Sequence, residues 1–220
     1  MKFSALAFDL DGTLYPNYRL YMHLVPFLMR NQRLLRAMDK ARKKLRESGE
    51  YGIDYYDTQA ALMADALGKP VEMIKNQTER LIYRGWEPFF KKIALFPHVQ
   101  ETLDCFRRVG IKLGLLSDFP PENKLENLKI AGYWDAVLCS EQSGRLKPDQ
   151  KPFLDLARAM GTPPEGILYV GNSVPFDVVG AAGTGMKTAL IIPRWKKPPV
   201  STPPDFVFRD YRQLRDYVLS

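Results

Sequence analysis

The chain of 220 residues is poor in the residue types that build zinc sites, disulfide frameworks and histidine-based triads, with two cysteines and two histidines. Cys105 and Cys139 fall in an expected helix and an expected strand, which favours buried reduced thiols over a disulfide. His23 and His98 are too few and too far apart in sequence for a zinc site or a catalytic triad. Reduced thiols indicate the cytoplasm as the default location.

Long apolar runs are also absent. No run approaches the roughly 20 residues that a membrane-spanning helix needs, so we expect no membrane partner. The N-terminus passes directly into strand-like sequence, without the basic segment and small-residue cleavage site of a signal peptide. The hydrophobic content of 45% is that of an ordinary globular protein and supports a sizeable core. Nothing in the sequence indicates an oligomeric state.

The net charge of +7 is concentrated in residues 16–95, which hold 15 basic and 9 acidic residues. Eight of the basic residues lie close together, with Asp39 as the one acid among them: Arg30, Arg33, Arg36, Lys40, Arg42, Lys43, Lys44 and Arg46. Such a run fits a nucleic-acid or anionic-membrane face, or a solvated helix face on a protein with anionic substrates. We favour the solvated face because the run lacks the interleaved aromatic residues that stack on bases.

Strand-like and helix-like segments alternate outside residues 16–95. Short apolar runs predict strands at Phe3–Leu10, Ile111–Ser117, Ala136–Cys139, Ile167–Val170 and Thr188–Ile192, with a short edge strand at Phe206–Phe208. Helices are expected between them at Val99–Val109, Glu122–Ala131, Lys151–Met160 and Phe176–Ala182, and at Tyr211–Leu219. This alternation predicts an α/β fold with a doubly wound parallel sheet. In such sheets the active site lies beyond the carboxyl ends of the strands.

Residues 16–95 have a different pattern, in which leucine, phenylalanine and methionine recur at helical spacing with no strand signal. Pro26 is expected to kink or break the first helix. Two further helices are expected at Asp57–Leu67 and Val71–Tyr83. We therefore expect an all-helical domain of residues 16–95 inserted into a core formed by residues 1–15 and 96–220.

Two carboxylates, Asp9 and Asp11, directly follow the first strand. Because side chains on a strand repeat with period two, both can project toward one side. They repel each other unless a cation or a shared proton relieves them. The physical interpretation is a Mg²⁺ site in which one carboxylate attacks and the other handles a proton. Gly12 permits a tight turn, and Thr13 is expected to form a local hydrogen bond there.

Two further candidates stand on later segments. Ser117 ends the second expected strand, where its hydroxyl can donate a hydrogen bond to a bound oxyanion. Lys147 supplies a cation that can offset negative charge there, and Arg145 competes for this role. The expected substrate-binding set comprises Thr13, Ser117, Asp118 and Lys147.

Four segments occur in order: Asp9–Leu14, Ser117, the Lys147-Pro148 pair, and Gly171-Asn172-Ser173 followed by Asp177. They resemble the four motifs of the haloacid dehalogenase superfamily, most of whose members are phosphatases. The resemblance implies a Rossmann-like core with a type 1 helical cap that closes over the catalytic face. It also implies that Asp9 is a nucleophile that forms an aspartyl-phosphate and that Asp11 is the general acid and base. Their environments should push their two pKa values apart.

The resemblance further implies Mg²⁺ as cofactor, held by Asp9, the backbone carbonyl of Asp11 and Asn172, with Asp177 acting directly or through water. Asn172 departs from the family pattern, which usually has aspartate at this position. An amide oxygen can coordinate Mg²⁺. One negative charge is lost, however, so metal affinity should fall unless Asp177 compensates.

The expected function is therefore Mg²⁺-dependent hydrolysis of a small phosphomonoester, with a small phosphorylated metabolite as partner. The superfamily also contains dehalogenases, which typically lack an equivalent of Asp11, and phosphonatases, for which nothing singles out a lysine among Lys40, Lys43 and Lys44. Phosphomutase chemistry stays open. A phosphate-ester binding or regulatory protein weakened by Asn172 is the main rival, and a nucleic-acid partner is a lesser one. The basic segment mildly favours a substrate with extra negative charge, while nucleotides, sugar phosphates and glycolate-type acids all remain candidates.

Overall fold

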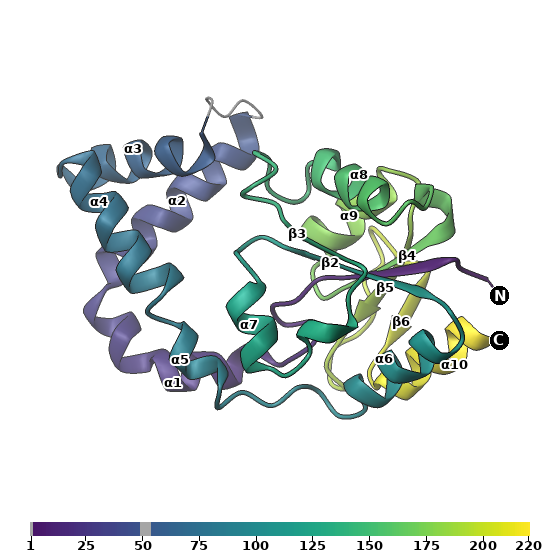
Figure 1. Ribbon diagram of the computed structural model, residues 1–220. Coiled ribbons are helices and arrows are strands. Elements are labelled where there is room, and N and C mark those ends of the chain that lie inside the picture. Colours follow the sequence, from purple (N-terminus) through teal and green to yellow (C-terminus); the bar gives the residue numbers. More distant parts are fainter. Residues whose placement is uncertain (1, 49–53) are drawn as a thin grey trace.

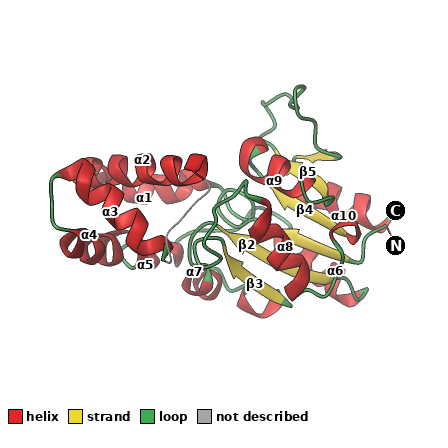
Figure 2. Ribbon diagram, turned by 90° about the horizontal axis from the view of Figure 1, so that it is seen from above, coloured by secondary structure: helices red, strands yellow, loops and turns green. Residues whose placement is uncertain are grey.

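The computed structural model describes residues 2–48 and 54–220. Its centre is a six-stranded sheet in the order β3-β2-β1-β4-β5-β6, in which every neighbouring pair is parallel (Figures 1 and 2). The strands are β1 (Ala5–Phe8), β2 (Lys112–Ser117), β3 (Ala136–Cys139), β4 (Ile167–Gly171), β5 (Lys187–Ile191) and β6 (Phe206–Phe208). The predicted α/β class and parallel sheet are confirmed.

Helices cover both faces of this sheet. Helix α6 (Val99–Arg108) directly precedes β2. The helices that follow β2 are α7 (Glu122–Asn127), α8 (Gln150–Ala159), α9 (Val179–Ala182) and α10 (Tyr211–Leu219). Short 3₁₀ turns lie at Ala131–Tyr133 (η2) and Pro164–Gly166 (η3), and a π-helical turn, η4, spans Val174–Val178. Strand alternation explains the layering, because Leu6 and Phe8 join the core cluster that includes α6 and α10, whereas Ala5 and Ala7 join the cluster that includes α8.

The segment between β1 and α6 is predominantly helical in its described part. It holds α1 (Asn17–Arg30), α2 (Gln32–Ser48), α3 (Tyr55–Leu67), α4 (Val71–Thr78), the π-helical turn η1 (Glu79–Tyr83) and α5 (Glu87–Phe90). These helices lie beside the sheet rather than on its faces (Figures 1 and 2). They have an apolar cluster of their own that includes Met38, Met63 and Ile74.

Several local expectations need correction. Pro26 does not break helix α1, which continues to Arg30, where the side-chain amide of Asn31 donates to the carbonyl of Phe27. The helix expected over Phe176–Ala182 begins two residues earlier as the π-helical turn η4, and α7 ends at Asn127 instead of Ala131. Both cysteines are free thiols; Cys139 is buried as predicted, whereas Cys105 is half-buried.

Within residues 2–48 and 54–220, we find no helix with the length and apolar character that crossing a membrane requires.

Candidate active site

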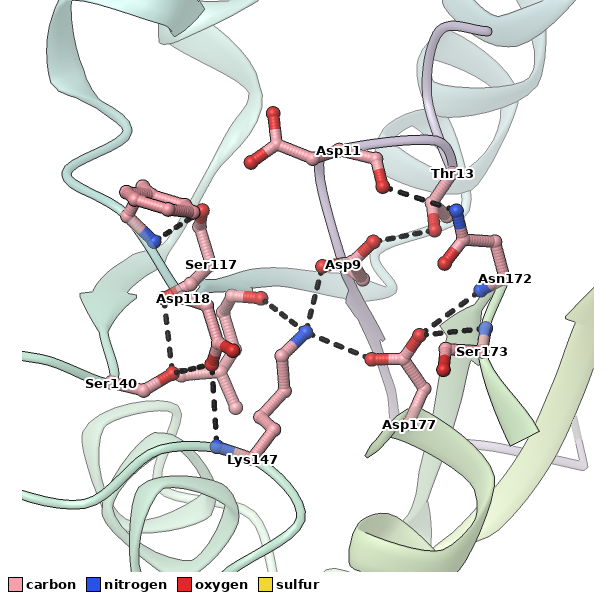
Figure 3. A network of polar contacts seen from close by, with 12 residues as sticks. Asp9, Asp11, Thr13, Ser117, Asp118, Ser140, Lys147, Asn172, Ser173 and Asp177 are labelled. Carbon is pink, nitrogen blue, oxygen red and sulfur yellow. Dashed lines mark hydrogen bonds and ion pairs between the residues drawn. The ribbon is translucent and has the colours of Figure 1, made fainter. Parts of the chain in front are cut away.

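Asp9 lies at the carboxyl end of β1 and is 6% exposed. Its backbone N–H donates to the carbonyl of Val170 at 2.9 Å, which extends the pairing of β1 with β4. The hydroxyl of Thr13 donates to one carboxylate oxygen at 2.7 Å, and the Lys147 ammonium donates to the other at 2.7 Å (Figure 3). The expected local hydrogen bond of Thr13 is thus confirmed, and Asp9 is held in one orientation by two donors.

Lys147 is buried and joins Asp9 to a second buried carboxylate. Its Nζ lies 2.7 Å from Asp9 and 2.8 Å from Asp177, so the three ionised groups would carry one net negative charge (Figure 3). Burial raises the pKa of Asp9 to about 7, although Lys147 acts in the opposite direction. The expected nucleophile, Asp9, is therefore the residue whose pKa is raised. A further cation beside Asp9 would favour the ionised form of its carboxylate. Arg145, the expected competitor, pairs with Asp149 at 3.7 Å.

Ser117 is fully buried at the end of β2, as expected from its place in the sequence. Its hydroxyl oxygen accepts a hydrogen bond from the backbone N–H of Phe119 at 3.2 Å, which leaves the hydroxyl hydrogen available. Ser117 and Lys147 therefore stand on adjacent segments at the same sheet edge as Asp9 (Figure 3).

Asp11 is more exposed than Asp9, with 28% of its side chain accessible, and it has different partners. The ammonium of Lys124 donates to both carboxylate oxygens, at 2.9 and 2.7 Å, and the hydroxyl of Tyr15 also donates to this carboxylate. The sequence analysis did not identify Lys124. The only signal for it was its position on α7, the helix that follows Ser117 at the same edge of the sheet.

The fourth motif lies directly against the first. The side-chain amide of Asn172 donates to the backbone carbonyl of Asp11 at 3.1 Å, and the backbone N–H groups of Asn172 and Ser173 donate to Asp177 at 3.1 and 3.0 Å (Figure 3). Gly12 permits this approach, because its φ is +89° and a Cβ there would lie 1.9 Å from the amide nitrogen of Asn172.

The donors beside Asp9 fit a small hard cation. Mg²⁺ takes oxygen ligands, and the backbone carbonyl of Asp11 lies 3.1 Å from the Asn172 side-chain amide, which donates a hydrogen bond to it in this structure. A half-turn of the amide would present its oxygen in place of its nitrogen. No group of three histidine, cysteine or acidic side chains in the described ranges is arranged to hold a metal. A cation here therefore depends on an amide and a backbone carbonyl in addition to Asp9.

Asp118, an expected substrate-binding residue, is engaged by protein groups. Its carboxylate accepts hydrogen bonds from Arg46 at 2.8 Å, from the Ser140 hydroxyl at 2.7 Å and from the Lys147 backbone N–H at 3.2 Å. Burial acts to raise the pKa of Asp118, but Lys147, Arg42 and Arg46 together lower it below its ordinary value. In this structure Asp118 ties the end of β2 to the loop that carries Lys147.

Two arginines of the basic run contradict the expectation of a wholly solvated face. Arg42 is 5% exposed and forms an ion pair with the buried Glu141, which follows β3. Arg46 donates through Nε to the backbone carbonyl of Lys147 at 2.9 Å. The other six basic residues of the run are exposed, as expected. Helix α2 therefore joins the helical segment to the two loops that hold Asp118 and Lys147.

Arg42→Ala should reduce the free energy of unfolding by about 3 to 5 kcal/mol at pH 8, because it leaves Glu141 buried without its cation. Burial raises the pKa of Glu141 to about 7, with Arg42 opposing, so the loss should shrink at pH 5, where Glu141 is protonated and its ion pair with Arg42 is absent. Urea unfolding at both pH values measures this. The exposed Lys43→Ala on the same helix is the control, and equal losses for the two variants would contradict the assignment.

The comparisons with known proteins agree with this geometry. The family model described as haloacid dehalogenase-like hydrolase matches residues 3–185, which include β1, the helical segment and all four motif segments. The chain therefore belongs to the haloacid dehalogenase-like hydrolases.

Two curated relatives have named activities. The chain is 27% identical to a phosphoglycolate phosphatase of Salmonella typhi over 188 residues, which cover 76% of this chain and 73% of the relative. It is 29% identical to a glyceraldehyde 3-phosphate phosphatase of Methanopyrus kandleri over 202 residues, which cover 85% and 83%.

Solved structures share the fold at lower identity. A HAD phosphatase from Thermococcus onnurineus superposes with a TM-score of 0.63 at 23% identity and covers 98% of this chain and 97% of its own. A 2-haloacid dehalogenase from Pseudomonas syringae pv. Tomato superposes with a TM-score of 0.70 at 22% identity and covers 99% and 98%. Because the fold is shared by phosphatases and dehalogenases, the reaction must be argued from the site.

Proposed function

We propose that this hydrolase is a Mg²⁺-dependent phosphatase that cleaves a small phosphomonoester through an aspartyl-phosphate on Asp9. The observation that carries the proposal is the buried Asp9, oriented by Thr13 and Lys147 within hydrogen-bond distance, next to a second carboxylate on Asp11. The activities named for the two curated relatives support the same reaction class. Asp11 separates this site from a dehalogenase site, in which no leaving alcohol needs a proton.

The proposed reaction has two steps on the same carboxylate. A carboxylate oxygen of Asp9 attacks phosphorus while the bond to the leaving oxygen breaks and Asp11 donates a proton to that oxygen. Ser117 and Lys147 donate to the phosphoryl oxygens, where negative charge accumulates. Asp11 then takes a proton from the water that attacks the aspartyl-phosphate, which releases inorganic phosphate and regenerates Asp9.

Mg²⁺, when bound, would supply positive charge that keeps Asp9 ionised and offsets charge on the phosphoryl group. Asp9, the Asp11 carbonyl and Asn172 would hold it. Asp177, whose oxygens accept from Lys147 and two backbone N–H groups, would act directly or through water. We also propose that residues 16–95 form a cap domain over a core of residues 1–15 and 96–220, and that the free thiols reflect a cytoplasmic enzyme.

The proposal is tested by phosphate release from p-nitrophenyl phosphate, phosphoglycolate and glyceraldehyde 3-phosphate, with Mg²⁺ and with EDTA. We expect release from at least one ester with Mg²⁺ and a loss of release in EDTA that added Mg²⁺ reverses. Undiminished release in EDTA would contradict the metal dependence. Saturable binding of these esters without any release would instead identify a phosphate-ester binding protein.

Asn172→Asp should lower the Mg²⁺ concentration for half-maximal phosphate release by about tenfold, because a carboxylate adds the negative charge that the amide lacks beside a divalent cation. A Mg²⁺ titration of initial rates measures the shift. Asn76→Asp, an exposed change on α4, is the control for added charge and should leave the titration unchanged. A half-maximal concentration that stays equal or rises in Asn172→Asp would place the metal elsewhere.

A further inference from the structure

A cleft of about 380 Å³ lies between the helical segment and the loop and helix that follow β2. Five aromatic side chains line it: Tyr56, Tyr83, Trp86 and Phe90 from the helical segment and Phe119 from the core. Its volume falls within the range of about 300 to 1,000 Å³ that is typical of small-molecule sites. A two-carbon group such as glycolate would leave most of this space unfilled.

Two residues that line the cleft form hydrogen bonds with residues proposed to act in the reaction. Lys124 lines it and donates to both carboxylate oxygens of Asp11, at 2.7 and 2.9 Å. Phe119 lines it and its backbone N–H donates to the Ser117 hydroxyl at 3.2 Å. The ammonium of Lys124 also lies 5.3 Å from the ring centroids of both Phe90 and Phe119. The cleft therefore begins beside Asp11, the proposed proton donor to the leaving oxygen.

The charges that line the cleft favour an occupant without negative charge. Glu79 pairs with Arg84 at 2.7 Å, and Lys124 pairs with Asp11, so each of these two cations has an acidic partner in this structure. Glu87 and Glu122 also line the cleft, and neither has an ion pair with another residue in the described part of the chain. A carboxylate on the leaving group would therefore meet uncompensated negative charge. The arginines that the basic run contributes to the interface, Arg42 and Arg46, are bound to acids and a carbonyl of the core.

We propose that this cleft receives the leaving group of the substrate and selects phosphomonoesters whose leaving group carries an aromatic ring and no carboxylate. The inference rests on the proposed phosphatase function for its reaction, but its ligand preference is separable from turnover. Aromatic rings gain energy from offset or edge-to-face contacts with the lining rings beyond the area that they bury. The basic run by itself favours a substrate with an additional negative charge, whereas the charges that line this cleft favour a leaving group without one.

Binding to the Asp9→Asn variant separates recognition from chemistry. Isothermal titration with Mg²⁺ present compares ethyl phosphate, 2-phenylethyl phosphate, 2-cyclohexylethyl phosphate and phosphoglycolate, which all carry phosphate on a primary carbon. We expect 2-phenylethyl phosphate to have a Kd at least about tenfold below that of ethyl phosphate, with the cyclohexyl ester between them and phosphoglycolate weakest. Equal Kd values, or phosphoglycolate as the tightest ligand, would overturn the proposal.

Two substitutions test the lining directly. Phe119→Leu should reduce the ratio of phenylethyl to ethyl phosphate affinity at least threefold, and Glu122→Gln should tighten phosphoglycolate binding at least threefold. Glu126→Gln, which removes an equal charge from an exposed position on the same helix, should leave both quantities unchanged. Unchanged ratios in the first two variants would remove the cleft as the binding site.

Turnover by the wild-type enzyme then distinguishes the two proposals. Selective binding without phosphate release from any ester would refute the phosphatase function and retain the cleft assignment. Phosphate release with no preference among the esters would refute the cleft assignment and retain the phosphatase function. Absence of both binding and release would refute both.

Discussion

Asp9→Asn should lower phosphate release at least about 1,000-fold, because the amide cannot act as the nucleophile, while the protein becomes as stable as the wild type or more so. When all three are ionised, Asp9, Asp177 and Lys147 carry one net negative charge in a buried site. The variant removes this excess and leaves the Lys147–Asp177 pair, with its 2.8 Å contact, in place.

The pH dependence of this effect has a defined sign. Burial raises the pKa of Asp9 from 3.8 to about 7, so ionisation of Asp9 destabilises the folded protein as the pH rises through that interval. The gain in stability from Asp9→Asn should be absent near pH 4 and fully present above pH 7. Thermal unfolding of the apo protein across this range measures it.

Asp39→Asn, at an exposed position on α2, is the matched control and should change neither phosphate release nor the unfolding temperature. Phosphate release by Asp9→Asn within tenfold of the wild-type rate would exclude Asp9 as the nucleophile.

Lys147→Met should lower phosphate release by about 100- to 1,000-fold, because the cation that donates to the developing charge is lost. It should also destabilise the protein by about 3 to 5 kcal/mol, because it leaves Asp9 and Asp177 buried without their shared cation. Substitutions at the two ends of one ion pair thus have opposite expected effects on stability. The reason is that one relieves an excess of negative charge and the other increases it.

Urea unfolding and phosphate release together measure this second effect. Combining Lys147→Met with Asp177→Asn should restore part of the stability and none of the activity, since the buried charge falls but the cation stays absent. Lys151→Met, which removes a half-exposed ammonium on α8, is the control. A Lys147→Met protein as stable as the control would show that Lys147 does not neutralise the two carboxylates.

The strands, their parallel arrangement and the placement of the four motifs could be predicted from the sequence, whereas the order of the strands in the sheet came from the structure. Asp9, Ser117 and Asn172 each end or follow a short apolar run, and the carboxyl ends of parallel strands meet at one edge of the sheet. The local pattern was therefore sufficient to predict that these residues lie close together. Lys147 lies at the same edge, on the loop that follows β3. The helical character of residues 16–95 followed equally from local spacing, although the end of α1 at Arg30 depended on the Asn31 side chain rather than on Pro26.

Contacts between the helical segment and the core were decided by tertiary structure alone. Arg42 and Arg46 have the same chemistry as their exposed neighbours in the basic run, and only the docking of α2 on the loops after β2 and β3 distinguishes them. Lys124 reaches Asp11 across 113 residues of sequence. No local period encodes such contacts, because they depend on how the helical segment packs against the loops at the edge of the sheet. The sequence by itself thus determined the parallel sheet, the positions of the motif residues and the hydrolase family, whereas the partners of Asp11 and Asp118 and the aromatic cleft exist only through packing.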